Sequence, residues 1–240
     1  MGIIRMGIPE ELVILLQKNY SLNKFVETGT YYGNTAIWAT KYFKNVSTIE
    51  LSEKLFQITS SKYKDFQSVE FLFGDSRSQL SKLINSIDEQ ALFWLDAHWS
   101  GGVTYGKEDQ CPLLEEIEII NRSPLNHFIL IDDARLFMSP PQPPHDIEAW
   151  PNIVEVIDAL RAGKESRDTY IVIIEDVIVA VPNYAKPELS KYCQEVNLKI
   201  WEEYGRSNLQ KGLKLINSDI SSILSLPKRI LRKIHQEIFE

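Results

Sequence analysis

Short apolar runs alternate with helix-like segments over most of this chain, and no other feature of the sequence constrains the fold as strongly. The apolar runs lie at 24–30, 46–51, 69–75, 91–98 and 127–135. The segments with helical spacing between them lie at 35–43, 52–66, 76–87 and 112–122. Near-continuous apolar strands that are separated by helices are typical of a parallel sheet covered on both faces. The sequence therefore predicts an α/β fold of the Rossmann-like, doubly wound class.

The pattern changes after a further helix-like segment at 152–163. Residues 170–182 form two strand-length apolar runs separated by Glu175 and Asp176, and an acidic pair at this place is typical of a hairpin turn. With the five earlier runs, this predicts a seven-stranded, mostly parallel sheet with an antiparallel last strand. We expect this domain to span residues 1–182 and a helical C-terminal extension to span residues 183–240.

Composition and charge argue against several classes of protein. The chain has 240 residues and a formal net charge of −7, which disfavours bulk attraction to nucleic acid. No apolar run approaches the roughly 20 residues that a transmembrane helix needs. Residues 1–20 fit a structural helix better than a signal peptide. The only cysteines, Cys111 and Cys193, lie far apart, so we expect free thiols and a cytoplasmic, reducing environment.

Acidic residues stand where the predicted strands end. In an open parallel sheet, ligands bind outside the carboxyl ends of the strands, near the switch in strand order. The acids at these ends are Glu27, Glu50, Asp75, Asp96, Asp132 and Asp133. One acid at a strand end is unremarkable, but six from five strands predict a binding site. The alternative is a set of solvated strand ends with turn glycines.

The first three strand ends suit different parts of a nucleoside ligand. Gly29 and Gly33 flank a loop in which missing side chains would let a ligand approach the backbone, although the G-x-G-x-x-G dinucleotide pattern is absent. Glu27 precedes this loop; it would repel a pyrophosphate and suits a cationic ligand. Glu50 is placed to accept hydrogen bonds from ribose hydroxyls, and Asp75 from an adenine amino group.

Three motifs carry a resemblance to a known family. The stretches FVETGTYYGNT, TIELS and FGDS resemble the motifs of class I S-adenosylmethionine-dependent methyltransferases, and the resemblance covers roughly residues 20–182. It implies S-adenosylmethionine as the cofactor, with the methionyl part at the glycine loop, the ribose at the second strand and the adenine at the third. The cofactor-binding residues that it implies are Glu27, Thr28, Gly29, Gly33, Asn34, Thr35, Glu50, Asp75, Ser76 and Asp96.

Asp96, Asp132 and Asp133 form a second acidic set, after the fourth and fifth strands. Converging carboxylates raise one another's pKa unless a cation lies between them, so we expect a hard divalent ion such as Mg²⁺. Such an ion would bind substrate hydroxyls and ease the loss of a proton. The alternative is that Asp132 or Asp133 caps the following segment and that Asp96 pairs with Arg135.

The same set resembles, more weakly, that of the macrocin-type, metal-dependent O-methyltransferases that act on sugar hydroxyls. Asp96 and the pair Asp132–Asp133 match that pattern, but His98 stands where the family has a second acid. A histidine can act as a general base near neutral pH. We therefore expect His98 and Asp96 to be catalytic, in O-methylation of a hydroxyl on a sugar or another small polar metabolite.

Several residues near these strand ends are candidate substrate contacts: Trp99, Tyr105, Lys107, Arg135 and His145. Tyr105 and Lys107 lie in a glycine-containing segment that resembles a mobile lid, for which a solvated loop is the alternative. Trp99 would stack on a ligand or pack beneath that loop. His145 follows a proline-rich segment and otherwise is a surface histidine.

The C-terminal segment carries a basic, amphipathic pattern at 226–240. Such a helix would dock on its own domain or on a second subunit, which would make a homodimer; an anionic membrane surface is the other alternative.

Two other function classes stay open from the sequence. A nicotinamide-dependent oxidoreductase shares this type of sheet, but the missing third glycine and Glu27 count against it. A non-catalytic member of the fold that binds a nucleotide or a protein partner would leave the acidic strand ends unexplained. Loop composition does not identify the methyl acceptor.

Overall fold

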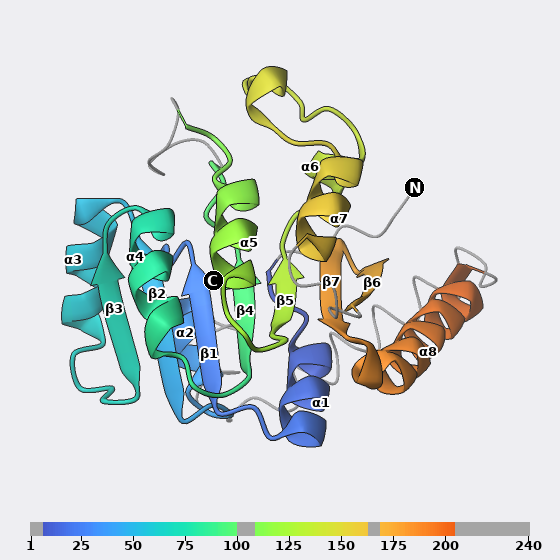
Figure 1. Ribbon diagram of the computed structural model, residues 1–240, viewed down its shortest axis with the longest axis horizontal. Coiled ribbons are helices and arrows are strands. Elements are labelled where there is room, and N and C mark those ends of the chain that lie inside the picture. The colour runs from blue at the N-terminus through green and yellow to red at the C-terminus, as the bar shows by residue number, and fades with distance from the viewer. Residues whose placement is uncertain (1–6, 100–108, 163–168, 205–240) are drawn as a thin grey trace, which may run out of the picture. The chain divides into compact units, whose positions relative to one another are not determined.

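A computed structural model describes residues 7–99, 109–162 and 169–204, and it shows a seven-stranded sheet with helices on both faces (Figure 1). The strands are β1 (Lys24–Thr28), β2 (Asn45–Glu50), β3 (Val69–Phe73), β4 (Ala91–Leu95), β5 (Phe128–Ile131), β6 (Thr169–Ile174) and β7 (Val177–Pro182). The α-helices are α1 (Glu10–Tyr20), α2 (Asn34–Ala39), α3 (Glu53–Lys62), α4 (Ser76–Leu83), α5 (Leu113–Asn121), α6 (Arg135–Met138), α7 (Ile153–Arg161) and α8 (Lys186–Tyr204). Short 3₁₀ helices cover Ile84–Ser86, Ile147–Ala149 and Asn183–Ala185.

The strand order is β3-β2-β1-β4-β5-β7-β6, which confirms the predicted doubly wound sheet. β1 pairs in parallel with β2 on one side and with β4 on the other. The first three strands therefore lie in sequence order from β1 outward to β3, and β4 lies on the opposite side of β1. The strand order therefore reverses between β1 and β4, and in sheets of this kind ligands bind in the crevice outside the carboxyl ends of the strands at such a switch point.

The hairpin between β6 and β7 also agrees with the prediction. Glu175 and Asp176 have φ angles of 51° and 66°, and β7 is antiparallel to both β6 and β5. Two consecutive residues with positive φ are what a two-residue type I′ hairpin turn requires, and aspartate tolerates that conformation better than most residues.

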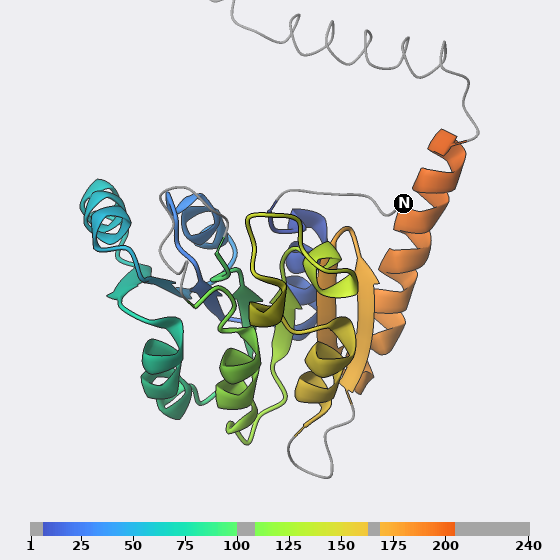
Figure 2. The same cartoon turned by 90° about the horizontal axis from the view of Figure 1, so that it is seen from above.

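Helices cover both faces of the sheet, as the apolar strands require. Figure 2 shows α1, α2 and α3 on one face and α4, α5 and α7 on the other. All five residues of β4 are buried, whereas the edge strand β3 is only partly covered. Burying one large side chain stabilises a fold by roughly 1.5–3 kcal/mol, so the central strands contribute most to holding the crevice in place.

Polar caps begin the helices that follow the strands. Ser52 is the N-cap of α3 and accepts from the Leu55 amide at 3.5 Å, and Asn152 and Glu155 form a capping box on α7. Pro112 directly precedes α5, and α2 ends at Ala39, earlier than the predicted 43. These caps fix where each helix leaves the edge of the sheet.

The chain divides into two compact units, Met1–Leu189 and Ser190–Glu240. The division falls inside α8, and the domain boundary between residues 182 and 183 stays a prediction. Among the residues described, none of the helices combines the length and apolar character needed to cross a bilayer.

Candidate active site

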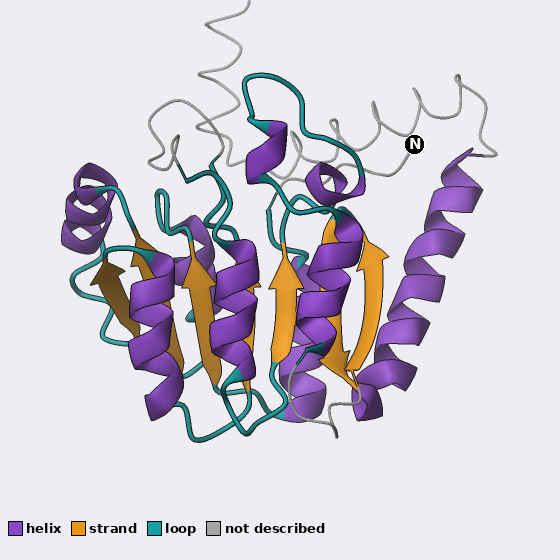
Figure 3. Cartoon of the chain, turned by 45° about the horizontal axis from the view of Figure 1, so that its top comes forward, coloured by secondary structure: helices purple, strands orange, loops and turns teal. Residues whose placement is uncertain are grey.

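Strands β2, β1, β4 and β5 are parallel, so their carboxyl ends, where the acidic residues stand in the sequence, lie at the same edge of the sheet (Figure 3). Thr28 at the end of β1 is level with Ile49 of β2 and with Leu95 of β4. The acids are close enough to raise one another's pKa, since Asp96 acts on Glu27 and both Asp132 and Asp133 act on Asp96. Five of the six acids, Glu27, Glu50, Asp96, Asp132 and Asp133, therefore lie close to one another near the switch in strand order.

The two loop glycines make room for the chain itself. Gly29 has a φ of 87°, and a Cβ atom there would lie 2.2 Å from the carbonyl oxygen of Asp96. Gly33 has a φ of 75°, and its Cβ would lie 2.6 Å from Cγ2 of Thr59. The sequence suggested glycines that leave space for a ligand. Instead, their first effect is to let β1 close against the end of β4 and the loop close against α3.

Glu27 is a buried carboxyl group beside this loop, with 2% of its surface exposed. The Thr48 hydroxyl donates to Oε2 at 2.6 Å, and the Thr30 and Thr48 hydroxyls lie 2.6 Å apart. Burial raises the pKa of Glu27 to about 8; the Thr48 hydrogen bond opposes this, and the charge of Asp96 adds to it. A positive ligand would relieve the cost of ionising this group.

We expect the Glu27→Gln variant to be more stable than the wild type at alkaline pH. The folded-state pKa lies near 8 and the ordinary value is 4.5, so the stability that protonated Glu27 contributes is complete below pH 4.5 and is lost as the pH rises through 8. At pH 9 the variant should gain roughly 2–5 kcal/mol, because glutamine keeps the acceptor without the charge. Urea unfolding at pH 5 and pH 9 measures the gain, and the exposed Glu118→Gln change is the control. An equal gain at both pH values would contradict this assignment.

Glu50, at the end of β2, organises the first loop. Oε2 accepts from the Tyr31 amide and Oε1 from the Ser52 amide, both at 2.8 Å. Tyr31 has a positive φ of 49°, and its carbonyl accepts from the Thr59 hydroxyl at 3.0 Å. Burial raises the pKa of Glu50 although these backbone hydrogen bonds lower it. Each carboxylate oxygen has a second lone pair, so acceptor capacity for ribose hydroxyls remains.

Asp75 is occupied more fully than the sequence suggested. It caps α4 by accepting from the Ser78 amide at 3.2 Å, and the Arg77 guanidinium contacts both of its oxygens at 2.6–3.2 Å. Arg77 also pairs with Asp109. The hydrogen bond from Arg77 lowers the pKa of Asp75. This carboxylate is thus charged and largely compensated before any ligand binds.

The remaining residues of the motifs take different positions. Thr28 donates from Oγ1 to Glu116 at 3.4 Å and accepts from the Asp96 amide at 3.3 Å, which links the ends of β1 and β4. Ser76 is buried at the start of α4 and Asn34 is exposed at the start of α2. The Thr35 hydroxyl lies near Glu27 and lowers its pKa.

His98, Asp133 and Arg135 form a hydrogen-bonded series at the ends of β4 and β5. Nε2 of His98 lies 3.0 Å from Oδ2 of Asp133, whose Oδ1 accepts from Nη1 of Arg135 at 2.6 Å. Arg135 pairs in turn with Asp176 of the hairpin turn, and not with Asp96 as the sequence alternative supposed. Asp133 has a φ of 55°, and its amide donates to Oδ1 of Asp132 at 2.8 Å. The Asp132–Asp133 pair therefore holds the imidazole of His98 in one orientation.

The charges around His98 favour its protonated form. Burial lowers the pKa of the imidazole, but the hydrogen bond to Asp133 and the charges of Asp96, Asp133 and Asp132 outweigh burial, so the pKa is raised. Asp96 approaches Nε2 at 3.8 Å and has 32% of its side chain exposed. Burial of the Asp96 carboxyl group raises its pKa, and the charges of Asp132 and Asp133 add to this effect. The pKa of Asp133 is lowered, because its bonds to His98 and Arg135 outweigh burial.

The described residues do not provide the magnesium site that the sequence suggested. Over 7–99, 109–162 and 169–204, no group of three or more His, Cys, Asp or Glu side chains is arranged to hold a metal ion. Asp133 uses one oxygen for Arg135 and the other for His98. The positive partners of Asp133 are therefore side chains of the protein.

Of the candidate substrate contacts, the structure describes Trp99, Arg135 and His145. Trp99 is buried at 7% exposure and packs edge-on against His145, with ring centroids 5.2 Å apart, so it lines no open surface. Trp150 also contacts His145 at 5.2 Å and His98 at 5.4 Å. Burial lowers the pKa of His145. Tyr105 and Lys107 lie outside the described residues.

Two polar residues of this edge were missed from the sequence. Gln110 accepts through Oε1 from the Asp146 amide at 3.0 Å and from Nε1 of Trp150 at 3.1 Å, and so attaches the segment after α6. Glu116 of α5 is only 1% exposed. Its helical spacing from the buried Leu113 and Ile120 is the signal that places it on the apolar face of α5.

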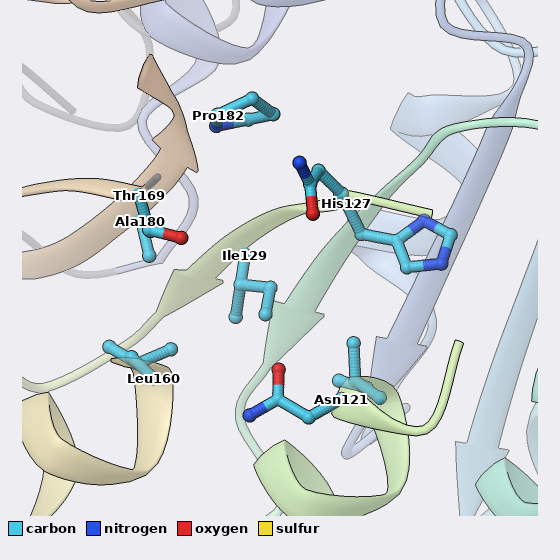
Figure 4. A pocket seen from close by; sticks show the side chains of 9 residues that line it. Asn121, His127, Ile129, Leu160, Thr169, Ala180 and Pro182 are labelled. Atoms are coloured by element: carbon cyan, nitrogen blue, oxygen red, sulfur yellow. The ribbon is translucent and has the colours of Figure 1, made fainter. Parts of the chain in front are cut away.

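A small pocket lies at the opposite edge of the sheet, beside the amino end of β5. Figure 4 shows Asn121, His127, Ile129 and Leu160 among its lining residues. Its cavity volume of about 20 Å³ has room for about one water molecule. Nδ1 of His127 accepts from the Ala91 amide at 3.2 Å and Nε2 lies 2.8 Å from the Ser123 hydroxyl, so His127 ties neighbouring elements together.

The fold is similar to solved structures of methyltransferases. A Staphylococcus aureus protein assigned as a caffeoyl-CoA O-methyltransferase matches with a TM-score of 0.50 and 16% identity, over 75% of this chain and 86% of that chain. An S-adenosylhomocysteine-bound methyltransferase from Podospora anserina matches with a TM-score of 0.49 and 18% identity, over 74% of this chain and 80% of that chain. No protein-family model and no curated protein matches the sequence.

The strand order, the antiparallel β7 and the likeness to the S. aureus structure define the class of the fold. The chain has the fold of class I S-adenosylmethionine-dependent methyltransferases. At 16% identity the likeness concerns the fold, and the chemistry has to be argued from the side chains at the strand ends.

Proposed function

We propose that this protein transfers the methyl group of S-adenosylmethionine to an oxygen of a small polar acceptor, with a sugar hydroxyl as the favoured class. The observation that carries the proposal is the His98–Asp133 pair, with Nε2 and Oδ2 3.0 Å apart, beside the acid-lined crevice. The S. aureus neighbour is assigned to O-methylation, which is compatible with an oxygen acceptor. Its substrate is not carried over to this chain.

The pair would act as an oriented general base. Asp133 would accept a hydrogen bond from Nε2–H of neutral His98, which makes Nδ1 the basic ring nitrogen. Bound S-adenosylmethionine would supply an activated methyl group, and Nδ1 would take the proton of the attacking hydroxyl while the carbon–sulfur electron pair stays on the departing thioether. The protonated imidazole would then return its proton to solvent. Proximity and orientation supply much of the rate in such a direct transfer.

The cofactor would lie along the ends of β1, β2 and β4. Glu50 is the acceptor for the ribose hydroxyls, and Glu27 and Asp96 provide negative potential for the sulfonium group. This assignment is supported by the burial of Glu27 and by the raised pKa of Glu27 and Asp96, which a cation would lower. Dimerisation through residues 183–240 and a cytoplasmic location stay predictions.

Turnover is expected to be unchanged, within about twofold, after dialysis against EDTA. Arg135 and His98 already occupy the oxygens of Asp133, so the proposed transfer does not depend on a metal at Asp133. Methylation assays with and without EDTA, and with added Mg²⁺, measure the effect. A loss of turnover that Mg²⁺ restores would favour the metal-assisted alternative, in which Asp133 leaves its partners.

Calorimetric titration with S-adenosylmethionine, S-adenosylhomocysteine and NADH tests the proposed function. We expect binding of the first two and none of NADH, followed by transfer of labelled methyl groups to hydroxyl compounds in a substrate screen. Binding of NADH alone would favour the oxidoreductase alternative. Binding of none of the three would overturn the proposed function.

A further inference from the structure

Glu116 is a buried acid that the proposed transfer does not use. It lies in the first turn of α5 with 1% of its surface exposed. Oε2 receives a long hydrogen bond of 3.4 Å from Thr28, and the Ser76 hydroxyl also lies near the carboxyl group and lowers its pKa. Oε1 is buried and has no hydrogen-bond partner in the part of the chain that the structure describes. A buried carboxylate with an unsatisfied oxygen is costly, and its retention calls for an explanation.

The surroundings of Glu116 place it at the crevice. The groups around it from other elements are Thr28 of β1, Asp75 and Ser76 at the start of α4, Asp96 and His98 after β4, and Cys111 before α5. Thr28 connects Glu116 directly to the Asp96 backbone, because it accepts from that amide. The carboxyl group therefore contributes negative potential at the ends of β1 and β4.

The nearby arginine side chains form ion pairs with other acids. Arg77 pairs with Asp75 and Asp109, and Arg135 pairs with Asp133 and Asp176. Among the described residues, neither arginine forms an ion pair with Glu116, Glu27 or Asp96, and the positive group that acts on Glu116 and Asp96 is His98. Burial raises the pKa of Glu116 to about 7, which is the response expected of an acid that lacks compensation.

We propose that Glu116 is a specificity-determining residue whose negative charge makes the site prefer the cationic sulfonium donor to the neutral thioether product. The proposal rests on the proposed function. The donor and the product differ by one methyl group and one positive charge, so uncompensated negative charge at the crevice acts on one and not on the other. This preference would favour release of S-adenosylhomocysteine after each transfer.

The expected size follows from Coulomb's law. Unit charges roughly 7–10 Å apart at an effective dielectric constant of about 20 change an equilibrium by roughly 15- to 60-fold. We therefore expect wild-type protein at pH 8 to bind S-adenosylmethionine at least about tenfold more tightly than S-adenosylhomocysteine. The Glu116→Gln variant should reduce this ratio to about threefold or less.

Isothermal titration with both ligands, on three variants, tests the assignment. Glu116→Asp keeps the charge and should keep most of the preference, whereas a purely structural role predicts equal losses for Glu116→Asp and Glu116→Gln. Glu118→Gln, on the same helix with 71% of its side chain exposed, should leave the ratio unchanged. Sinefungin, which carries an ammonium group near the sulfonium position, should bind like the donor.

Three results would count against the inference. Equal affinity of the wild type for donor and product would overturn it while the proposed function stands. An unchanged ratio in Glu116→Gln, with a cooperative unfolding transition that shows a folded variant, would also overturn it. Failure of the wild type to bind either ligand would overturn the proposed function itself, and the preference with it.

Discussion

The His98→Asn variant is expected to lose roughly 10²- to 10⁴-fold in kcat while its affinity for S-adenosylmethionine changes by no more than about twofold. Asparagine has a similar size and polarity but cannot take a proton from the acceptor. Asp133 keeps its pairing with Arg135 in the variant, so the loop after β5 should hold its shape. The loss should therefore appear in the transfer step and not in binding.

Single-turnover methylation separates the two effects. His127, the other buried histidine discussed above, lies at the opposite edge of the sheet, so His127→Asn should lower stability and leave kcat nearly unchanged. In the wild type, kcat should rise with pH and level off above the pKa of His98, which its aspartate neighbours raise, because only the neutral imidazole accepts a proton. A His98→Asn enzyme with more than a tenth of the wild-type kcat would refute the assignment.

The Gly29→Ala variant is expected to lose roughly 3–5 kcal/mol of unfolding free energy. The added Cβ would lie 2.2 Å from the Asp96 carbonyl oxygen, and an alanine at a φ of 87° is strained as well. Since the obstacle is backbone, no side chain can turn away to make room. The ends of β1 and β4 would have to separate, which would also weaken cofactor binding.

Gly7→Ala is the matched control for this change. Gly7 has a φ of 77°, close to that of Gly29, but a Cβ there meets nothing within 4 Å. Urea unfolding of both variants separates the strain of the backbone conformation from the steric overlap. If the two variants lost equal stability, the close approach of β4 to Gly29 would not be the reason for the glycine.

The fold was predictable because its determinants are local. Apolar runs separated by helical spacing specify a covered parallel sheet, and Glu175–Asp176 mark a hairpin turn because aspartate tolerates positive φ. The early end of α2 was not predictable, since the residues up to 43 keep a helical pattern although the helix ends at Ala39.

The site was only partly predictable, because the partners of its side chains are set by tertiary structure. The sequence placed six acids at one edge, but it could not show that Arg77 occupies Asp75 or that Arg135 and His98 occupy Asp133. A cluster of acids alone suggests a metal, whereas in the structure Asp133 pairs with Arg135 and orients His98. Glu116 was not predicted, because the apolar spacing indicates a buried face of α5 and Glu116 is a charged exception on that face.

The Asp176 turn has a consequence for how this enzyme fold can vary. Asp176 accepts through its carbonyl from the Ala134 amide at 2.8 Å and through Oδ1 from the Arg135 amide at 2.9 Å, besides pairing with the Arg135 guanidinium. The segment that follows Asp133, the partner of His98, is thus held by the two-residue turn between β6 and β7. Lengthening this turn by a single residue is therefore expected to weaken the hydrogen bonds that hold Ala134 and Arg135, and with them the position of Asp133 beside His98.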